Sequence, residues 1–324
     1  MEKSTLVQAV NLALREEMAS NPNVVVMGED VGKNGGVFRA TAGLFEEFGE
    51  KRVIDTPLSE TGIIGAAIGM AAYGLIPVVE IQFLGFIYPA MEQIISHAAR
   101  LRTRTKSRYH CPMVIRAPYG GGIHAPEHHS ESSEALFFHV PGIKVVVPST
   151  PSDARALLKS AIRDPDPVLF LEPARIYRSI KEEIKGDGLV PLGEARIVKT
   201  GKDITLIAWG AMLQVALKAA EAVQKEGIEA EVIDLRTLYP MDTDKIIESI
   251  KKTGRGVIVH EAPLKGGLGG EIAAVIQEKA FLYLEAPVSR VAGFNTAIPL
   301  PKLEQFYLPS AEGIIEAIHR TLRF

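Results

Sequence analysis

Two side chains stand where they could exchange protons with a bound molecule. Glu60 follows a turn at 55–59 and precedes a run of small and apolar residues at 61–71. This pattern predicts a carboxylate at the N-terminus of a tightly packed helix, where the helix dipole alone favours an exposed acid by about 0.3–1 kcal/mol. His129 ends a segment rich in glycine and histidine, 120–129. A histidine in such a loop suits proton transfer near neutral pH.

The histidine segment also admits a metal site. His124 and His128 are four residues apart, a spacing that places two ligands on one face of a helix. Pro126 lies between them and glycines precede them, so an irregular loop is predicted instead of a helix. The sequence offers no evident third ligand, and zinc is therefore the weaker of the two interpretations. Glycine clusters at 62–65 and 266–271 lack the G-x-G-x-x-G spacing, so a nicotinamide cofactor is also weakly supported.

Composition narrows the class of protein. The chain has 324 residues, of which 47% are hydrophobic and 23% charged, enough for two domains with large cores. Its formal net charge of −3 gives no electrostatic footprint for nucleic acid. The single cysteine, Cys111, rules out an intramolecular disulfide and fits a reducing compartment. The sequence shows no signal-peptide pattern and no run of about 18 apolar residues, so we expect a cytoplasmic protein that does not enter a membrane.

Apolar runs alternate with segments of helical periodicity, which predicts βαβ units and mainly parallel sheets. In the first half we expect strands at 24–27, 52–54, 77–82, 112–117, 143–147 and 167–171, and helices at 6–19, 41–48, 61–73, 88–101, 131–138 and 151–162. In the second half we expect strands at 203–210, 229–235 and 256–260, and helices at 211–226, 242–252 and 269–280.

The predicted fold class is α/β with two domains, each a mainly parallel sheet flanked by helices. A charged, glycine-rich stretch near 181–188 interrupts the alternation, so we place a linker at 181–200 between domains 1–180 and 201–324. Parallel sheets covered on both faces bind ligands beyond the carboxyl ends of their strands. The segments around Glu29, Glu60, Phe86 and His129 all fall at such ends.

Several motifs in combination resemble one known family. They are Gly28–Gly32, Gly35–Phe38, Asp55–Glu60, Glu80–Phe83, Gly120–Ser130, Val147–Pro151, Asp234–Leu238 and His260–Ala262. From about residue 4 to the C-terminus, the chain resembles the β subunit of the E1 component of thiamine-diphosphate-dependent 2-oxo acid dehydrogenases, of the pyruvate or branched-chain type. The resemblance implies a transketolase-like fold with a thiamine-diphosphate pyrimidine-binding domain and a transketolase C-terminal-like domain. It also implies an α2β2 heterotetramer with an E1 α subunit and the cofactor at each α–β interface.

The resemblance gives roles to four residues. Glu60 hydrogen-bonds the pyrimidine nitrogen of thiamine diphosphate, Phe86 stacks on that ring, and Glu29 joins an acidic network behind Glu60 or lies exposed in its loop. His129 assists reductive acylation of the lipoyl group of the E2 acyltransferase, after oxidative decarboxylation of the 2-oxo acid. His128 competes with His129 for this role, because the two histidines are adjacent.

The resemblance also bears on metals. The thiamine-diphosphate magnesium motif begins Gly-Asp-Gly and ends with asparagine roughly thirty residues later, but the first asparagine after 186–188 is Asn295. We interpret 186–188 as a turn and expect the α subunit to hold Mg²⁺. A structural potassium ion in some members corresponds here to Met113, Ala161, Asp164 and Asp166, where Asp166 replaces the usual asparagine.

The resemblance also implies a second partner protein. The E2 acyltransferase is expected to contact the chain through its lipoyl and subunit-binding domains, with Glu285 and the carboxylate of Phe324 as candidates for the latter contact. Two other functions stay open, an acetoin dehydrogenase β subunit and a non-catalytic transketolase-like assembly protein. Pyruvate and branched-chain substrates also stay open, because the α subunit shares the pocket and one methylene changes discrimination by only about 1–3 kcal/mol.

Overall fold

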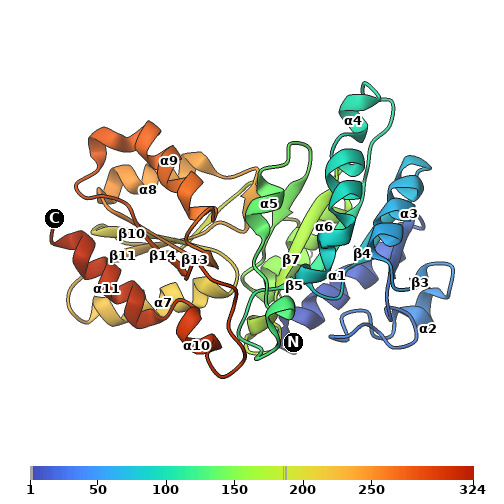
Figure 1. Ribbon diagram of the computed structural model, residues 1–324, viewed down its shortest axis with the longest axis horizontal. Helices are drawn as coiled ribbons and strands as arrows, with labels where there is room; N and C mark the ends of the chain where they lie inside the picture. Colours follow the sequence, from blue (N-terminus) through green and yellow to red (C-terminus); the bar gives the residue numbers. More distant parts are fainter. Residues whose placement is uncertain (1–2, 185, 187) are drawn as a thin grey trace.

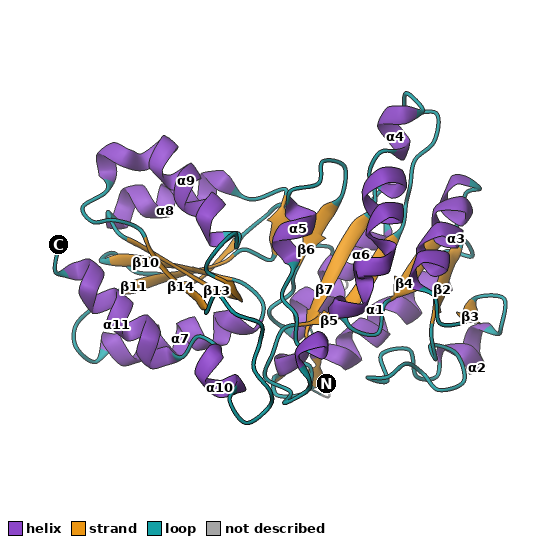
Figure 2. Cartoon of the chain, in the orientation of Figure 1, coloured by secondary structure: helices purple, strands orange, loops and turns teal. Residues whose placement is uncertain are grey.

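The short apolar runs of the sequence form the strands of two sheets, and helices cover both faces of each sheet (Figures 1 and 2). The computed structural model of the chain describes residues 3–184, 186 and 188–324. The N-terminal half, blue to green in Figure 1, lies beside the C-terminal half, which runs from yellow to red. The α/β fold with two mainly parallel sheets, predicted from the sequence, is confirmed.

The N-terminal sheet is parallel except at one edge. Within the described residues its seven strands have the order β12, β6, β7, β5, β4, β2, β3. Their bounds are β2 (Val24–Gly28), β3 (Val53–Asp55), β4 (Ile76–Glu80), β5 (Val114–Tyr119), β6 (Lys144–Val146), β7 (Val168–Pro173) and β12 (Thr237–Tyr239). The antiparallel edge strand β12 comes from the second half of the sequence and pairs with β6. The two halves therefore share a sheet.

Local signals explain where the helices of this half begin. Thr5 caps α1 through a capping box with Gln8, and Thr150 caps α6, whose first residue is Pro151. The helices are α1 (Leu6–Ser20), α2 (Leu44–Phe48), α3 (Glu60–Ala72), α4 (Leu101–Arg104), α5 (Glu134–Phe138) and α6 (Pro151–Ile162). A small antiparallel pair, β1 (Ser4–Thr5) with β8 (Lys181–Glu182), lies at the start of the predicted linker.

The C-terminal sheet repeats the parallel pattern. Its order within the described residues is β14, β13, β10, β11, β9, and only the β11–β9 pair is antiparallel. The strands are β9 (Arg196–Lys199), β10 (Ile204–Ala208), β11 (Ala230–Asp234), β13 (Gly256–Pro263) and β14 (Ser289–Gly293). The helices are α7 (Ala211–Gln224), α8 (Thr243–Thr253), α9 (Gly269–Ala280), α10 (Glu304–Tyr307) and α11 (Ala311–Leu322). In Figure 1, α8 and α9 lie on one face of this sheet and α7 and α11 on the other.

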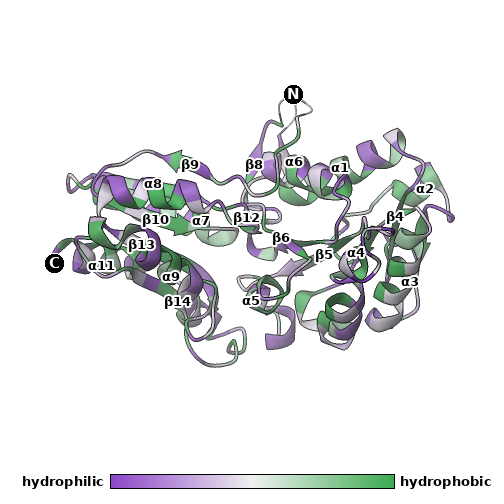
Figure 3. Ribbon diagram, turned by 90° about the horizontal axis from the view of Figure 1, so that it is seen from above, coloured by the Kyte–Doolittle hydropathy of each residue, from purple (hydrophilic) through white to green (hydrophobic). Residues whose placement is uncertain are grey.

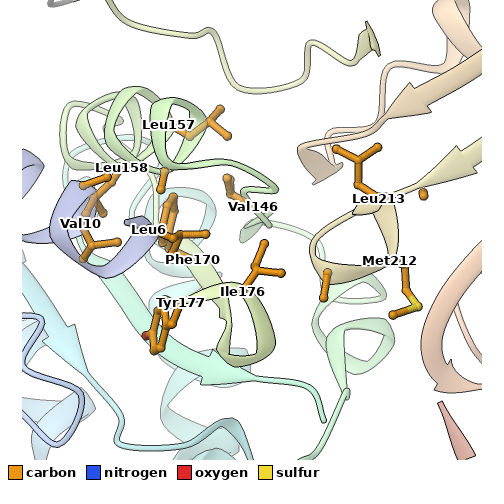
Figure 4. Packing of buried hydrophobic residues seen from close by; sticks show 14 of the residues in the cluster. Leu6, Val10, Val146, Leu157, Leu158, Phe170, Ile176, Tyr177, Met212 and Leu213 are labelled. Atoms are coloured by element: carbon orange, nitrogen blue, oxygen red, sulfur yellow. The ribbon is translucent and has the colours of Figure 1, made fainter. Parts of the chain in front are cut away.

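Alternate strand residues point into two apolar cores. Val78 belongs to one core and Val79 to the other, as expected for a strand buried on both faces. Figure 4 shows one core, in which Leu6 of α1 and Tyr177 share a cluster with Met212 of α7. Apolar colour also runs along β10 and β13 in Figure 3. Because each core contains residues from both halves, the halves are packed on each other.

One predicted element is wrong in type. The α-helix expected at 88–101 is instead a 3₁₀ segment, Leu84–Ala90, followed by a π-helical turn, Gln93–Ala98, before α4. Pro89 has no backbone N–H to donate, so an α-helix that starts at Leu84 would be interrupted there, and the segment forms a 3₁₀ turn. The turn predicted at 186–188 contains Asp187, which lies outside the described residues. In the part of the chain that the structure describes, no helix is long and apolar enough to cross a membrane.

Candidate active site at the carboxyl edge of the N-terminal sheet

Four neighbouring strands deliver the predicted site residues to one edge of the sheet. Strands β5, β4, β2 and β3 are adjacent and parallel, so the loops after them emerge on the same side. Glu29 follows β2, Glu60 follows β3, Phe86 follows β4, and His129 lies in the long loop after β5. The structure therefore brings these four residues to one edge, as ligand sites in parallel sheets require.

Glu60 is the first residue of α3. Ser59 caps this helix, and its hydroxyl accepts a hydrogen bond from the Gly62 N–H at 3.3 Å. Glu60 is half-buried in the first turn of α3, where the helix dipole stabilises negative charge. It is therefore accessible to a ligand that approaches this end of α3.

Glu29 lies close enough to Glu60 for their charges to interact. Partial burial raises the pKa of Glu29, and the negative charges of Glu60 and Asp30 raise it further. A hydrogen bond with the backbone of Ser59, the residue that caps α3, opposes this rise. A neighbouring negative charge favours the protonated form of a carboxyl group, as seen here for Glu29.

Phe86 and His129 belong to an aromatic cluster. The centroid of the His129 ring lies 4.5 Å from that of Phe83 and 5.1 Å from that of Phe86, both edge to face. His129 is half-buried, and within the described residues its Nδ1 atom has no hydrogen-bond partner. His128 is exposed and tilts against Phe86 at 5.4 Å. Both histidines contact aromatic rings, and His129 is the more buried of the two.

Gly85 explains how the histidine loop reaches the aromatic residues. A Cβ atom placed on Gly85 would lie 2.1 Å from the backbone oxygen of His128. Only glycine allows this approach between the 3₁₀ segment after β4 and the loop after β5. The pairing of Phe86 with His129 therefore depends on glycine at position 85.

A buried charged network supports the sheet beneath the site, and the sequence interpretation did not identify it. Arg116 of β5 donates hydrogen bonds to Glu80 at 2.7 Å and to both carboxylate oxygens of Glu172, at 2.7 and 2.9 Å. Tyr177 donates its hydroxyl to Glu172 as well. Burial raises the pKa of Glu80. For Arg116, burial acts to lower the pKa, but the negative charges of Glu172 and Glu80 outweigh burial and raise it. Charged residues inside apolar strands were the signal for this network.

Of the proposed potassium residues, Asp164 and Asp166 lie between α6 and β7, Ala161 lies in the last turn of α6, and Met113 directly precedes β5. Their carboxylates are already neutralised, because Lys144 pairs with Asp164 at 2.5 Å and Arg102 pairs with Asp166 at 2.7 Å. The Met113 carbonyl accepts the Val168 N–H at 3.0 Å, and the Ala161 carbonyl accepts the Asp164 N–H at 3.2 Å. The side chains of this group therefore do not call for a cation.

The structure also locates the other residues that the sequence suggested as contact or metal sites. Glu285 is exposed and pairs with Arg255 at 2.6 Å, and Phe324 is exposed at the end of the chain. His124 pairs with Glu304. It is not part of a helix, and its backbone has a left-handed conformation. Across the described residues, no group of three or more His, Cys, Asp or Glu side chains is placed to hold a metal ion. A zinc site in the histidine loop thus has no structural support.

Comparisons with known proteins match this architecture. Residues 2–179 match the family "Transketolase, pyrimidine binding domain", and residues 193–314 match "Transketolase, C-terminal domain". The solved "Split gene transketolase, inactive beta4 tetramer" superposes with a TM-score of 0.82 at 27% identity, over 98% of each chain. The fold and the matches together define a two-domain transketolase-like protein.

Two curated relatives narrow the family. The chain is 49% identical over 325 residues to "Pyruvate dehydrogenase E1 component subunit beta" of Bacillus subtilis (strain 168), across 100% of both chains. It is 48% identical over 327 residues to "2-oxoisovalerate dehydrogenase subunit beta" of the same organism, again across 100% of both. The chain therefore belongs to the family of E1 β subunits of 2-oxo acid dehydrogenases. These matches favour that family over an acetoin dehydrogenase subunit or a non-catalytic assembly protein.

Proposed function

We propose that this chain joins an E1 α subunit in an α2β2 heterotetramer that decarboxylates a 2-oxo acid, pyruvate or a branched-chain acid, with thiamine diphosphate. The acyl group is then transferred to the lipoyl group of an E2 acyltransferase. One observation carries the proposal: Glu60, with Glu29 beside it, reaches the same sheet edge as the pair of Phe86 and His129, in a chain of the E1 β family.

The described residues fit the pyrimidine half of the cofactor. An aminopyrimidine needs an acid at its ring nitrogen and an apolar face, and Glu60 and Phe86 supply these. When bound, thiamine diphosphate supplies the nucleophilic carbon and the electron sink of the reaction. Glu60 would hold a proton at the pyrimidine nitrogen, and the neighbouring charge of Glu60 contributes to the raised pKa of Glu29. This chain offers no recognised magnesium motif, so we assign Mg²⁺ and the diphosphate to the α subunit.

His129 serves the transfer step in this proposal. Its ring is held edge-on by Phe83 and Phe86, and its buried Nδ1 lacks a partner among the described residues. A neutral-pH acid is needed when the dithiolane sulfur of the lipoyl group is reduced, and general acid catalysis typically supplies about 10²–10⁴-fold. His129 would donate that proton.

The surface beside Glu60 supports a partner subunit. Leu58 is 77% exposed just before α3, and Tyr73 is 89% exposed just after it. Between them the exposed positions of α3 are small residues, Thr61, Gly62, Ala66 and Gly69, which allow close approach of another backbone. We assign this surface to the α subunit, which would cover the open side of the site.

We also propose which residues contact the E2 acyltransferase and where a potassium ion would bind. Glu285 and the carboxylate of Phe324 would face the E2 subunit-binding domain, because both are exposed in the C-terminal half. A potassium ion near Met113 would be held by backbone carbonyls, since Asp164 and Asp166 are paired with Lys144 and Arg102. We keep 1–180 and 201–324 as the domain bounds, with 181–200 between them.

Co-expression with an E1 α subunit tests the proposal. The purified complex should release CO₂ from pyruvate or 2-oxoisovalerate only when thiamine diphosphate and Mg²⁺ are added. The chain alone is the matched control and should show no activity. Turnover without thiamine diphosphate would contradict the proposal. Failure of the folded chain to assemble with every E1 α subunit tested would also contradict it.

A further inference from the structure

The histidine loop is held through its backbone by two carboxylates of the C-terminal half. The Gly121 N–H donates to Glu261 Oε2 at 3.0 Å. The Gly122 N–H donates to Glu304 Oε1 at 2.7 Å, and the His124 N–H donates to Glu304 Oε2 at 3.1 Å. Glu261 belongs to β13 and Glu304 is the first residue of α10. Both oxygens of Glu304 are therefore used on the loop of the other half.

Both carboxylates are buried, which makes these contacts costly to lose. The exposed fraction is 6% for Glu261 and 1% for Glu304. A buried carboxylate needs hydrogen bonds or a counter-charge to be tolerated. Burial raises the pKa of Glu261 to about 7, while the Gly121 N–H and the charge of Arg175 act to lower it. The loop backbone is thus part of what stabilises these two acids.

The three glycines of the loop fit this contact closely. A Cβ on Gly120 would lie 2.5 Å from Glu261 Oε2, and one on Gly121 would lie 3.0 Å from Glu304 Oε1. A Cβ on Gly122 would lie 2.6 Å from Cγ of Arg175. Gly120 and Gly122 also have φ of +82° and +92°, which other residues rarely adopt. The Gly-Gly-Gly run is therefore explained by the two carboxylates and the Arg175 side chain against which it lies.

The held end of the loop is linked to its histidine end. The Gly120 N–H donates to the Glu131 carbonyl at 3.0 Å, which closes the loop around the intervening residues. At the far end the His128 carbonyl lies against Gly85, and the His129 ring lies against Phe83. Gly121–His124 and His129 therefore belong to one short closed segment.

We propose that Glu261 and Glu304 form an interdomain clamp that positions His129 by fixing the backbone of the glycine loop. They are positioning residues, because they act on the site only through the loop. The existence of the clamp is independent of the proposed function. Only its consequence for acyl transfer rests on the role proposed for His129.

Amide hydrogen exchange in the full-length chain tests the clamp directly. Glu304→Ala should raise the exchange rates of the Gly122 and His124 amides by about 10- to 100-fold each, the usual effect of losing a hydrogen bond to a charged group. Glu304→Gln should raise mainly the rate at one of the two amides, because its NH₂ group cannot accept a hydrogen bond. Gln305→Ala, on the neighbouring exposed position of α10, is the control and should leave both amides unchanged. Unchanged exchange in a folded Glu304→Gln variant would overturn the clamp.

Glu261 offers a conservative rescue. Glu261→Gln keeps an oxygen that can accept from Gly121, so the Gly121 amide should retain its protection. Glu261→Ala should lose it by a similar factor to that at Gly122. Equal exchange at Gly121 in the two variants would contradict the assigned contact.

The positioning role of the clamp is tested in the complex assembled with the α subunit. Glu304→Gln should lower acyl transfer to a free lipoyl domain by tenfold or more, about as a misplaced group does, and should leave decarboxylation with an artificial electron acceptor within about threefold. Raised amide exchange with unchanged transfer would show that the clamp does not position His129, and would overturn the inference. If His129→Ala itself spares transfer, the proposed function of His129 fails, whereas the exchange results still decide whether the clamp exists.

Discussion

Gly85 offers a sharp steric test of how the site is assembled. It lies between the 3₁₀ residues that carry the aromatic cluster and the loop that carries His129. Its backbone conformation is not left-handed, so alanine can be placed there without backbone strain. The substitution Gly85→Ala therefore acts mainly on the distance between this segment and the carbonyl of His128, with a second, looser contact to Cγ of Glu131 at 3.2 Å.

The size of the effect follows from the contact. The new Cβ would meet the His128 oxygen at 2.1 Å, whereas real Cβ contacts essentially never fall below 3.0 Å. The two backbones must therefore separate by about 0.9 Å. Forcing such overpacking typically costs about 1–3 kcal/mol of stability. A displacement of about 1 Å in a catalytic group can cost about 10²-fold in rate.

We expect Gly85→Ala to lower acyl transfer to a lipoyl domain by about 10²-fold in the α–β complex. Decarboxylation measured with an artificial electron acceptor should also fall, because Phe86 lies in the same 3₁₀ segment as Gly85, but by less than transfer, because Glu60 is attached to a different strand. Gly188→Ala is the matched control, since a Cβ there meets no atom within 4 Å. A Gly85→Ala complex that transfers acyl groups within threefold of wild type would refute the placement of His129.

Three further outcomes are expected. His129→Ala should reduce transfer selectively, with His128→Ala as the matched control; a selective loss in His128→Ala instead would reassign the role. The isolated folded chain should give little heat with thiamine diphosphate and Mg²⁺ in calorimetry, because it lacks a recognised magnesium motif; micromolar binding without a partner would exclude a shared site. A few residues added after Phe324 should weaken binding to the E2 subunit-binding domain and lower its salt dependence; an unchanged affinity and salt slope would remove the C-terminus from that contact.

The sequence was sufficient for the central parallel strands of both sheets and for the position of the site loops, whereas β9 and β14 of the C-terminal sheet were not predicted. Continuous apolar runs such as 24–28 leave few alternatives to strands buried on both faces, and parallel order places their following loops together. The position of Glu60 at the start of a helix was predictable because a run of small and apolar residues follows the turn. These features depend on residues near each other in the chain.

Long-range contacts were not predictable in the same way. β12 joins the N-terminal sheet from the second half, which nothing in its three residues indicates. The 3₁₀ and π turns around Pro89 replace a helix whose apolar spacing looked regular. Glu304 reaches the glycine loop across a sequence separation of about 180 residues, and its short helix carries no periodic pattern. Burial and backbone approach, which decide these contacts, are properties of the folded chain.

Proton exchange at the thiazolium carbon of bound thiamine diphosphate tests the central claim most directly. The exchange is followed by NMR after rapid mixing with D₂O, in complexes of an α subunit with either wild-type chain or Glu60→Gln. The amide has the same shape as the carboxylate but cannot share a proton with the pyrimidine nitrogen, so we predict exchange slower by at least about 10²-fold in an intact tetramer. Exchange within a few fold of wild type would contradict the assignment of Glu60 and of the site built around it.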